Sequence, residues 1–524
     1  MENYNIISVE EEKQRQLLNN GLIMADRFIN KNYLIDLPKK NVMIIDETFK
    51  NNNAIRLFAV EKLVFDKEEN VNDKLISVYS ALQEIDSAVL MLISGTESDV
   101  QIYLGIRSYE NASTASKILE KGMKGNFPGS KIKSLKNSEI RNIMDGIAVS
   151  KYVNMPKNIS SVTVIPSTRD EDKEKFVQGI EKFIDAMQGE CYTALFIANP
   201  VSKEQLEQQK RGYEELYSSL SPFIKTTLAY GDNYSKAVTK GMFENFSHSI
   251  NNSIANTTGR NSGINSSVTH GRNTGFNMGG NGGSISTGTS KSNTSGYSSG
   301  QSWSKAVTEG TADTTGTGTN DSDTITEGTS RTLTVEHQNK SVAVLLDTID
   351  AHLERIKACE AFGVWECAGY FIADDVQTSV VAANTYKALM IGDDTYVENA
   401  FINTWGIQSQ EQIGELMEYM KYAQHPVFEI PAEAGFEEQY VTPTNYISGR
   451  EVTLLQGLPQ KSVSGITVSN IAEFGRNVYV QDRKTDEKTI SIGKVYHMGN
   501  TEKQDVNLSL ESFTSHCFIN GSTG

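Results

Sequence analysis

The sequence predicts an α+β protein in which two βαββαβ units follow one another along the chain. Three observations predict this fold class. Segments with strand character alternate with segments that carry one apolar helical stripe. A long segment rich in Gly, Ser, Thr and Asn interrupts the second unit between two amphipathic helices. Short β segments with turns between them follow the second unit.

The first unit is predicted within residues 1–145. Its strands are apolar runs, and its helices repeat apolar residues every three or four positions, as Leu75, Val78 and Leu82 do. The strands are expected at 55–65, at 88–108 as two strands joined by a Thr-Glu-Ser-Asp turn, and at 131–135, with helices at 73–85 and 111–125. The order βαββαβ is the ferredoxin-like pattern.

A second, distended copy of the pattern is predicted within residues 146–440. Its strands are expected at 149–155, 191–198 and 363–373, with helices at 173–188 and 375–390. In this interpretation a helical hairpin replaces the simple turn between the two central strands. The sequence therefore predicts tandem ferredoxin-like units.

Two amphipathic helices flank the polar segment. The first, 202–220, has Ser202 and Gln205 at capping-box spacing. The apolar stripes consist of Leu206, Tyr213, Leu216 and Leu220 in the first helix, and of Val342, Leu345, Ile349, Leu353 and Ile356 in the second, 340–358. Because each helix has one apolar stripe and needs a partner, we expect the two to pair as a hairpin. The alternative, in which the polar segment links two independent domains, stays open.

The segment expected at the tip of this hairpin covers about 235–335. Between residues 251 and 330, 56 of the 80 residues are Gly, Ser, Thr or Asn. Such a composition cannot bury enough apolar surface to offset its chain entropy, so we predict disorder. The glycine cluster at 278–284 has no strand before it and no helix after it, which favours a flexible insert over a phosphate loop.

The character of the chain changes again over 441–510, where we predict a small β subdomain. A short helix is expected at 448–459, followed by strands at 462–468, 477–482, 489–496 and 505–510.

Composition restricts the function classes. The net charge of −16 argues against a surface that binds nucleic acid or an anionic membrane unaided, because neutralising phosphates needs clustered Lys and Arg. The four cysteines have no CxxC spacing, which favours reduced core residues. The charged N-terminus has no apolar signal-peptide core, and no apolar run approaches the ~20 residues of a transmembrane span. These features predict a cytoplasmic protein.

Residues 42–47 (VMIIDE) resemble a Walker B strand, in which neighbouring carboxylates hold Mg²⁺ and orient water. No phosphate loop precedes them, so we interpret them as a strand that runs into an acidic turn. The seven histidines show no zinc-ligand spacing, and Cys359 and Cys367 are interpreted as core thiols. We therefore predict no catalytic residue and no metal site in this chain.

The last residues carry one nucleotide-binding motif. A P-loop consists of a strand, the sequence GxxxxGK[ST] and a helix, and its backbone N–H groups hold the phosphates. Residues 518–524 (FINGSTG) fit the strand and the first four of the eight loop positions. The candidate cofactor-binding residues are therefore Gly521, Ser522, Thr523 and Gly524, and we expect 511–524 to be the first strand and partial P-loop of a truncated ATPase domain.

Residues 490–524 resemble the start of the motor domain in HerA/FtsK/VirB4-type P-loop ATPases. In that family an lG.i strand and a polar segment precede an l..l..H.fi.GsTGsGKS phosphate loop. The matching residues are Ile492-Gly493-Lys494-Val495, Leu510, His516, Phe518 and Gly521-Ser522-Thr523-Gly524. The stretches 362–375 and 124–132 and the polar hairpin resemble the N-terminal region of bacterial ATP-binding proteins of this group.

The resemblance implies that the intact parent is a ring-forming, ATP-driven translocase. Such a parent would be a hexamer that uses ATP and Mg²⁺ and acts on DNA or on a secretion apparatus. The family's loop continues with Ser-Gly-Lys-Ser or Ser-Gly-Lys-Thr, which supply the phosphate-binding Lys and the Mg²⁺-binding hydroxyl. Without these residues and Walker B, we expect this chain neither to hydrolyse ATP nor to bind it tightly.

Two hypotheses follow for the chain itself. In the first, it is the oligomerisation and partner-docking portion of the translocase. In the alternative, it is a self-contained, non-enzymatic assembly or interaction protein whose Ser/Gly-rich segment is a flexible binding arm.

Overall fold

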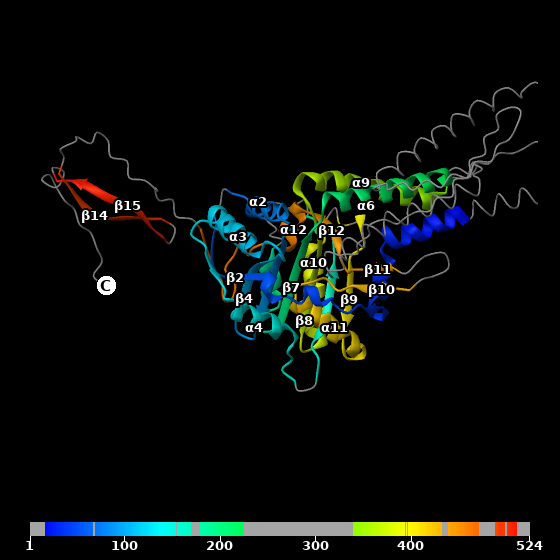
Figure 1. The fold of residues 1–524 in the computed structure, drawn as a ribbon, viewed down its shortest axis with the longest axis horizontal. Coiled ribbons are helices and arrows are strands. Elements are labelled where there is room, and N and C mark those ends of the chain that lie inside the picture. The colour runs from blue at the N-terminus through cyan, green and yellow to red at the C-terminus, as the bar shows by residue number, and fades with distance from the viewer. Residues whose placement is uncertain are drawn as a thin grey trace, which may run out of the picture. The chain divides into compact units, whose positions relative to one another are not determined.

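The computed structural model describes residues 16–65, 69–152, 155–168, 179–224, 339–392, 395, 397–431, 439–470, 488–497 and 500–510. These residues form a mixed α+β fold whose strands pair almost entirely antiparallel (Figure 1). Among them, none of the helices combines the length and the apolar character that a membrane span requires.

A ten-stranded sheet forms the centre of this fold. Eight strands lie side by side in the order β5 (Lys131–Ser134), β2 (Ile55–Phe65), β4 (Val100–Arg107), β3 (Ala88–Gly95), β7 (Tyr192–Pro200), β8 (Val364–Ala373), β6 (Asn158–Thr163) and β9 (Phe401–Trp405), all antiparallel. β12 (Asn445–Ser448) adds to β8, and β13 (Thr467–Asn470) runs parallel to β2. Because β3 pairs with β7, strands of both predicted units share one sheet.

The two faces of the sheet carry separate hydrophobic cores, since successive side chains of a strand point to opposite faces. In β3, Met91 and Ile93 join one core, and Leu90 and Leu92 join the other. The first face is covered by α2 (Val71–Gln83), α3 (Ala112–Asn126), α5 (Ile180–Ala186), α10 (Val376–Met390) and α12 (Gly449–Leu455). The second is covered by α4 (Asn137–Ala148), α11 (Gln410–Lys421) and the 3₁₀-helix η1 (Asn32–Lys39).

A small three-stranded sheet consists of β1 (Asn41–Val42), β10 (Phe428–Ile430) and β11 (Gln439–Val441). β1 contains only the first residue of the stretch that resembled Walker B. Asp46 accepts a hydrogen bond from the backbone N–H of Thr48 at 2.9 Å and so caps the 3₁₀-helix η2 (Glu47–Phe49). Of residues 42–47 only Val42 lies in a strand, so the interpretation as a strand is wrong for the residues after it, whereas the acidic turn at Asp46 and Glu47 is present.

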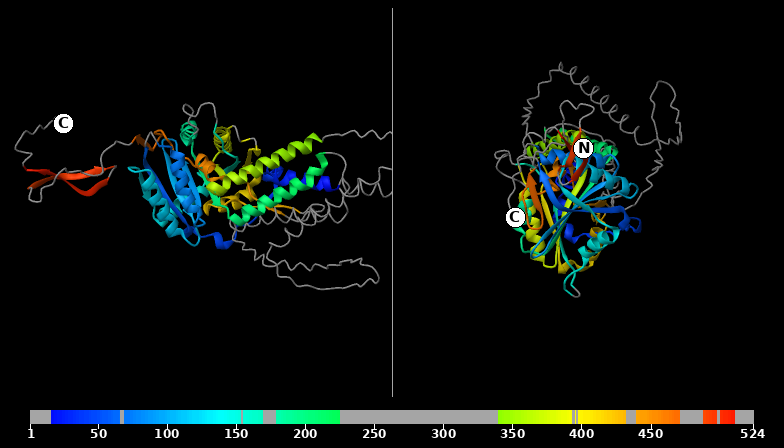
Figure 2. Two further views of the ribbon diagram at one scale, coloured as in Figure 1. Left: turned by 90° about the horizontal axis from the view of Figure 1, so that it is seen from above. Right: turned by 90° about the vertical axis from the view of Figure 1, so that its left-hand side faces the viewer.

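The helices α6 (Lys203–Leu220) and α9 (Lys340–Phe362) form the predicted hairpin (Figure 2). Lys210 and Glu360 approach to 3.7 Å, and the backbone N–H of Asn339 donates to the carbonyl of Ile224 at 3.3 Å. The capping box of Ser202 and Gln205 is present, as predicted. The pairing of the helices is therefore confirmed, whereas the segment 235–335 lies outside the described residues.

The buried stripe of α9 differs from the predicted one. It contains Leu346, not Leu345, and His352, not Leu353. His352 lies three residues after Ile349 and four before Ile356, so it occupies a core position of the helix. The prediction considered only apolar residues, so it assigned Leu345 and Leu353 to the buried stripe in place of their neighbours Leu346 and His352.

The strand predicted at 149–155 is wrong, because the strand at this point of the fold is β6 (Asn158–Thr163). β6 has little apolar character, yet all its side chains are buried between β8 and β9. The cost of burying the hydroxyl of Ser160 is offset by its hydrogen bonds with Thr404 Oγ1 at 2.9 Å and Ser379 Oγ at 3.2 Å. The helices α4 and α11 and the strand β9 were not anticipated either.

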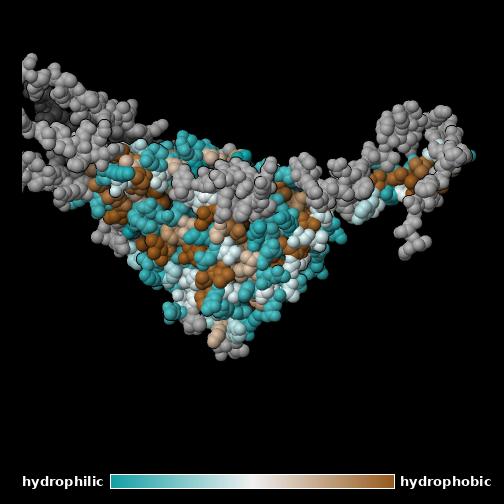
Figure 3. Space-filling view, turned by 180° about the vertical axis from the view of Figure 1, so that it is seen from behind, coloured by the Kyte–Doolittle hydropathy of each residue, from teal (hydrophilic) through white to brown (hydrophobic). Residues whose placement is uncertain are grey.

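Residues 441–510 contribute to two sheets. The predicted short helix is α12, whereas β12 and β13 belong to the large sheet. β14 (Thr489–His497) and β15 (Asn500–Ser509) form a separate two-stranded antiparallel sheet. It exposes Ile490, Ile492 and Leu508. Figure 3 shows apolar, brown side chains on this hairpin. The domain boundaries at 145/146, 440/441 and 510/511 stay predictions, and 477–482 and 511–524 lie outside the described residues.

Gly465→Ala should detach β13 from β2 and lower the free energy of unfolding by about 2–3 kcal/mol. Gly465 has a φ of 82°, and a Cβ there would lie 2.3 Å from the carbonyl oxygen of Val100. Urea unfolding followed by circular dichroism measures the change. The matched control is Gly125→Ala in α3, where a Cβ meets open space and the free energy should change by less than about 1 kcal/mol. Equal losses in both variants would contradict the prediction.

Candidate functional site: a buried ionic network

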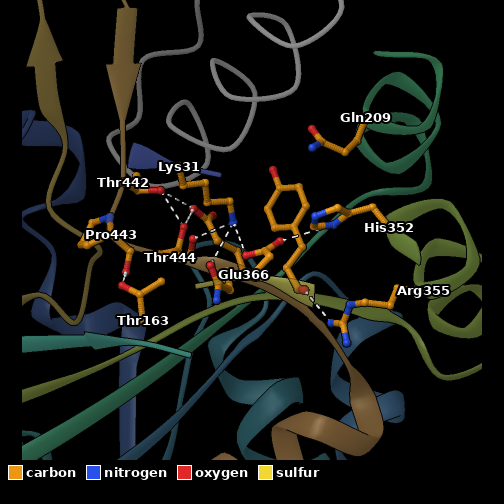
Figure 4. A network of polar contacts seen from close by, with 12 residues as sticks. Lys31, Thr163, Gln209, His352, Arg355, Glu366, Thr442, Pro443 and Thr444 are labelled. Carbon is orange, nitrogen blue, oxygen red and sulfur yellow. Dashed lines mark hydrogen bonds and ion pairs between the residues drawn. The ribbon is translucent and has the colours of Figure 1, made fainter. Parts of the chain in front are cut away.

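A network of buried charged and polar side chains lies where the base of the hairpin meets the large sheet (Figure 4). It joins segments that are far apart in sequence. We define this ionic network by Lys31, His352, Arg355, Glu366, Glu398 and Glu451, together with the hydroxyl residues Thr442 and Thr444. Glu366 is 2% exposed and Glu398 is 8% exposed, which charged groups tolerate only when they are paired.

The ion pair of Lys31 and Glu398 is the centre of the network. Lys31 Nζ lies 2.8 Å from Glu398 Oε2 and also donates to Asn445 Oδ1 at 2.9 Å and to the carbonyl of Thr444 at 3.4 Å. Lys31 adopts a left-handed backbone conformation, with φ 50° and ψ 40°, between the N-terminal helix (described from 16 to 28) and η1. The charge of Lys31 holds the pKa of Glu398 below its usual value, although burial alone would raise it.

His352 connects this ion pair to the hairpin. Its Nδ1 lies 3.6 Å from Glu398 Oε1, and its ring stacks on Tyr213 of α6 with centroids 5.2 Å apart. The hydroxyl of Tyr213 accepts a hydrogen bond from Gln209 Nε2 at 2.8 Å. Burial lowers the pKa of His352 from 6.5 to about 4, since the nearby carboxylate of Glu398 only partly opposes the desolvation of the charged ring. The imidazole is therefore neutral at pH 7.

Glu366 connects the network to the centre of the sheet. Its Oε1 accepts from the hydroxyls of Thr442 at 2.8 Å and Thr444 at 2.7 Å. Its backbone carbonyl lies 3.2 Å from Nε2 of His425, whose Nδ1 lies 2.7 Å from the hydroxyl of Tyr370. Burial lowers the pKa of His425 from 6.5 to about 4 as well. A second neutral imidazole thus belongs to the same contiguous group of contacts.

Arg355 fixes the end of α9 to α12. Its Nη1 and Nη2 lie 2.5 and 3.1 Å from the two carboxylate oxygens of Glu451, and Nη2 also donates to the carbonyl of Tyr446 at 3.2 Å. Glu451 Oε2 in turn accepts from the backbone N–H of Ser448 at 2.7 Å, which completes the capping box of α12. One carboxylate therefore caps a helix and holds the hairpin.

The chemistry of these contacts suits a structural role, in which the network holds the hairpin in a fixed position on the large sheet. Carboxylates accept from Lys, Arg and hydroxyl donors, and bidentate contacts such as that of Arg355 and Glu451 restrict geometry strongly. Within the part of the chain that the structure describes, no group of three or more His, Cys, Asp or Glu residues could hold a metal ion. The network can thus fix the hairpin to the sheet.

The candidate residues predicted from sequence are not part of this site. Gly521, Ser522, Thr523 and Gly524 lie outside the described residues. Sequence reasoning missed Lys31, Glu398 and Glu366, because nothing in the local pattern distinguishes them from solvated charges. For His352 a signal existed, namely its spacing of three and four residues from Ile349 and Ile356.

Comparisons with known proteins do not assign this chain to a family. A scan against protein-family models finds no matching family, and a search of curated proteins finds no match either. The function therefore has to be argued from the residues and their arrangement.

Proposed function

We propose that this chain is the oligomerisation and partner-docking portion of an ATP-driven, ring-forming translocase. One observation carries the proposal: the hairpin of α6 and α9 is anchored to the large sheet by the buried contacts of His352, Arg355 and Glu398. An arm held by buried, bidentate and stacked contacts keeps a fixed direction, which a docking element requires.

A tandem ferredoxin-like arrangement is part of this proposal. The strand orders β5-β2-β4-β3 and β9-β6-β8-β7 repeat one relative order, in which the fourth strand lies beside the first and the third lies between the first and the second. A helix follows each set of four strands, α4 after the first set and α11 after the second. Both helices pack on the same face of the sheet, in the core that contains Leu90 and Leu92. Such a repeat supports two units that join edge to edge through β3 and β7.

The motor part of the proposal rests on the resemblance of residues 490–524. β14 contains the Ile492-Gly493-Lys494-Val495 match, and Gly521, Ser522, Thr523 and Gly524 would begin the phosphate loop for ATP and Mg²⁺. The genomic reading frame tests it directly. We expect Gly-Lys-Ser or Gly-Lys-Thr among the codons that follow Gly524, and a frame without either sequence would contradict the motor assignment.

The alternative proposal, an assembly or interaction protein with a flexible binding arm, is favoured by the composition of 235–335. The two hypotheses differ in where binding occurs. In the translocase proposal the folded body docks and assembles into a hexamer, with DNA or a secretion apparatus as partner. In the alternative the arm itself binds.

Replacing residues 225–338 with a short Gly-Ser linker should leave both the melting temperature and the oligomeric state unchanged. The linker can close the hairpin because the backbone N–H of Asn339 and the carbonyl of Ile224 are already hydrogen-bonded at 3.3 Å. Circular dichroism melting checks the fold, and mass photometry compares the assemblies of the variant and the parent chain. An unchanged melting temperature with a lost assembly would refute docking by the folded body and favour the binding arm.

A further inference from the structure

A cavity of about 300 Å³ opens at the end of β8 opposite to Glu366. Its walls come from β3, β7, β8 and the end of α4. The titratable groups that line it include Lys151, Lys157, Cys191 and Asp374. This cavity shares no residue with the ionic network, and neither proposed function uses it.

Two of these rim residues are in direct contact. Nζ of Lys151 lies 3.1 Å from Sγ of Cys191, at hydrogen-bonding distance. The backbone N–H of Lys151 donates to Asp374 Oδ1 at 3.1 Å, which fixes the lysine segment against the end of β8. The contact with the Cys191 sulfur raises the pKa of the Lys151 ammonium, and the nearby carboxylates of Glu97 and Asp374 act in the same direction.

The other described cysteines provide the comparison. Burial raises the pKa of the Cys359 thiol to about 12 and raises that of Cys367 well above its usual value, so both stay protonated at pH 7. Cys191 is only half-buried and faces an ammonium group. Reactive cysteines are partly exposed and lie beside a cationic group, and Cys191 has both features.

We propose that Cys191 and Lys151 form an oxidation site, at which a hydroperoxide and the two side chains produce a sulfur–nitrogen cross-link. The Cys191 thiolate attacks one peroxide oxygen, so an S–O bond forms while the O–O bond breaks. With hydrogen peroxide, the leaving hydroxide takes a proton from the Lys151 ammonium and departs as water. Sulfur is oxidised to the sulfenic acid, the peroxide is reduced, and Lys151 becomes a neutral amine.

The second step follows from the first. The lone pair of the Lys151 amine attacks the sulfenic sulfur, the S–O bond breaks, and the hydroxyl leaves as water with a proton from the amine. The product is a sulfenamide that ties the segment after α4 to the start of β7. Because both residues line the cavity, the link closes its rim on that side, and a thiol reductant reopens it.

Peptide mass spectrometry after treatment with hydrogen peroxide tests the proposal. Because Cys517 lies outside the described residues, the parent chain carries Cys517→Ser to remove its thiol. We expect a cross-linked pair of peptides, containing residues 151 and 191, whose mass is lower than their sum by two hydrogen atoms and which dithiothreitol separates. Sulfenic acid at Cys191 without a link to Lys151, or no oxidation of Cys191, would overturn the proposal.

Three variants distinguish the effect of the Lys151 charge, the effect of its amine as a nucleophile, and the general effect of replacing a lysine on the rim. Lys151→Arg keeps the cation but has no condensing amine, so a sulfenic-acid probe should label Cys191 while the link disappears. Lys151→Met removes both the cationic neighbour of the Cys191 sulfur and the amine, so iodoacetamide should label Cys191 more slowly and the link should disappear. Lys157→Met is the matched control on the same rim, since Lys157 Nζ donates to the carbonyl of Gly146 at 3.4 Å and should not be needed. Loss of the link in this control as well would overturn the role of Lys151.

Discussion

Lowering the pH from 7 to 4 should reduce the free energy of unfolding by about 3 kcal/mol for each of His352 and His425. The pKa of each imidazole falls from 6.5 to about 4 on folding. Between pH 6.5 and pH 4 each histidine therefore binds more protons in the unfolded chain than in the folded chain. Unfolding takes up protons in this range, so a lower pH favours unfolding. The stabilisation is fully present above about pH 6.5 and is lost as the pH falls toward 4.

The surroundings of the two rings explain why neither is charged at neutral pH. His352 faces Glu398, which favours the charged form, and Lys31 and Arg355, which oppose it. Its Nε2 is buried and has no hydrogen-bond partner among the described residues, so a proton there would be unsolvated. For His425 the carboxylate of Glu366 and the guanidinium of Arg107 act in opposite directions, and burial decides the result.

Urea unfolding at a series of pH values between 7 and 5 measures this effect. The slope of the free energy against pH gives the number of protons taken up, and these two histidines should contribute nearly two near pH 5. His352→Gln and His425→Gln should each reduce the slope by about one proton, whatever their effect on absolute stability. A free energy that is independent of pH in the parent chain would contradict the prediction. An equally steep slope in the double variant would show that other groups cause it.

Lys31→Met should lower the free energy of unfolding by about 3–5 kcal/mol, because it leaves the carboxylate of Glu398 buried without its cation. Asn445 Oδ1 and the carbonyl of Thr444 lose a donor in the same variant. Removing the second charge should reverse much of the loss. We expect Lys31→Met combined with Glu398→Gln to be markedly more stable than Lys31→Met alone, which a double-mutant cycle in urea measures.

The control for this experiment is a surface ion pair with the same short distance. Lys39 Nζ lies 2.7 Å from Asp36 Oδ1, but the side chain of Lys39 is 80% exposed, whereas that of Lys31 is 15% exposed. Lys39→Met should therefore change the free energy of unfolding by less than about 1 kcal/mol. If Lys31→Met costs no more than Lys39→Met, the ionic network does not hold the fold together at this point.

The sequence predicted the regular elements well where hydrophobic periodicity was strong. The strand at 55–65 coincides with β2, and the helix at 375–390 differs from α10 by one residue. The face of α6 with Leu206 and Leu216 is buried as predicted. These elements bury apolar stripes in a pattern that each segment specifies by itself, so local periodicity was sufficient.

The errors occur where polar side chains are buried. β6 carries Ser160, Ser161 and Thr163, so the search for apolar residues placed the strand several residues too early. The buried hydroxyls of Ser160 and Thr163 are satisfied by hydrogen bonds, that of Ser160 with Thr404 and Ser379 and that of Thr163 with the carbonyl of Pro443. Those partners lie more than 200 residues away in sequence, and local reasoning has no access to them.

By itself, the sequence determined the α+β class and the helical hairpin on either side of a polar segment. These features depend on periodicity and composition, which are local properties. Only the tertiary structure decided that one sheet joins both predicted units through β3 and β7, and that Lys31, His352 and Glu398 meet. The physical reason is burial: the same Lys, His and Glu residues would be solvated charges on a surface. The fold removes them from water, and only then do their partners and pKa values matter.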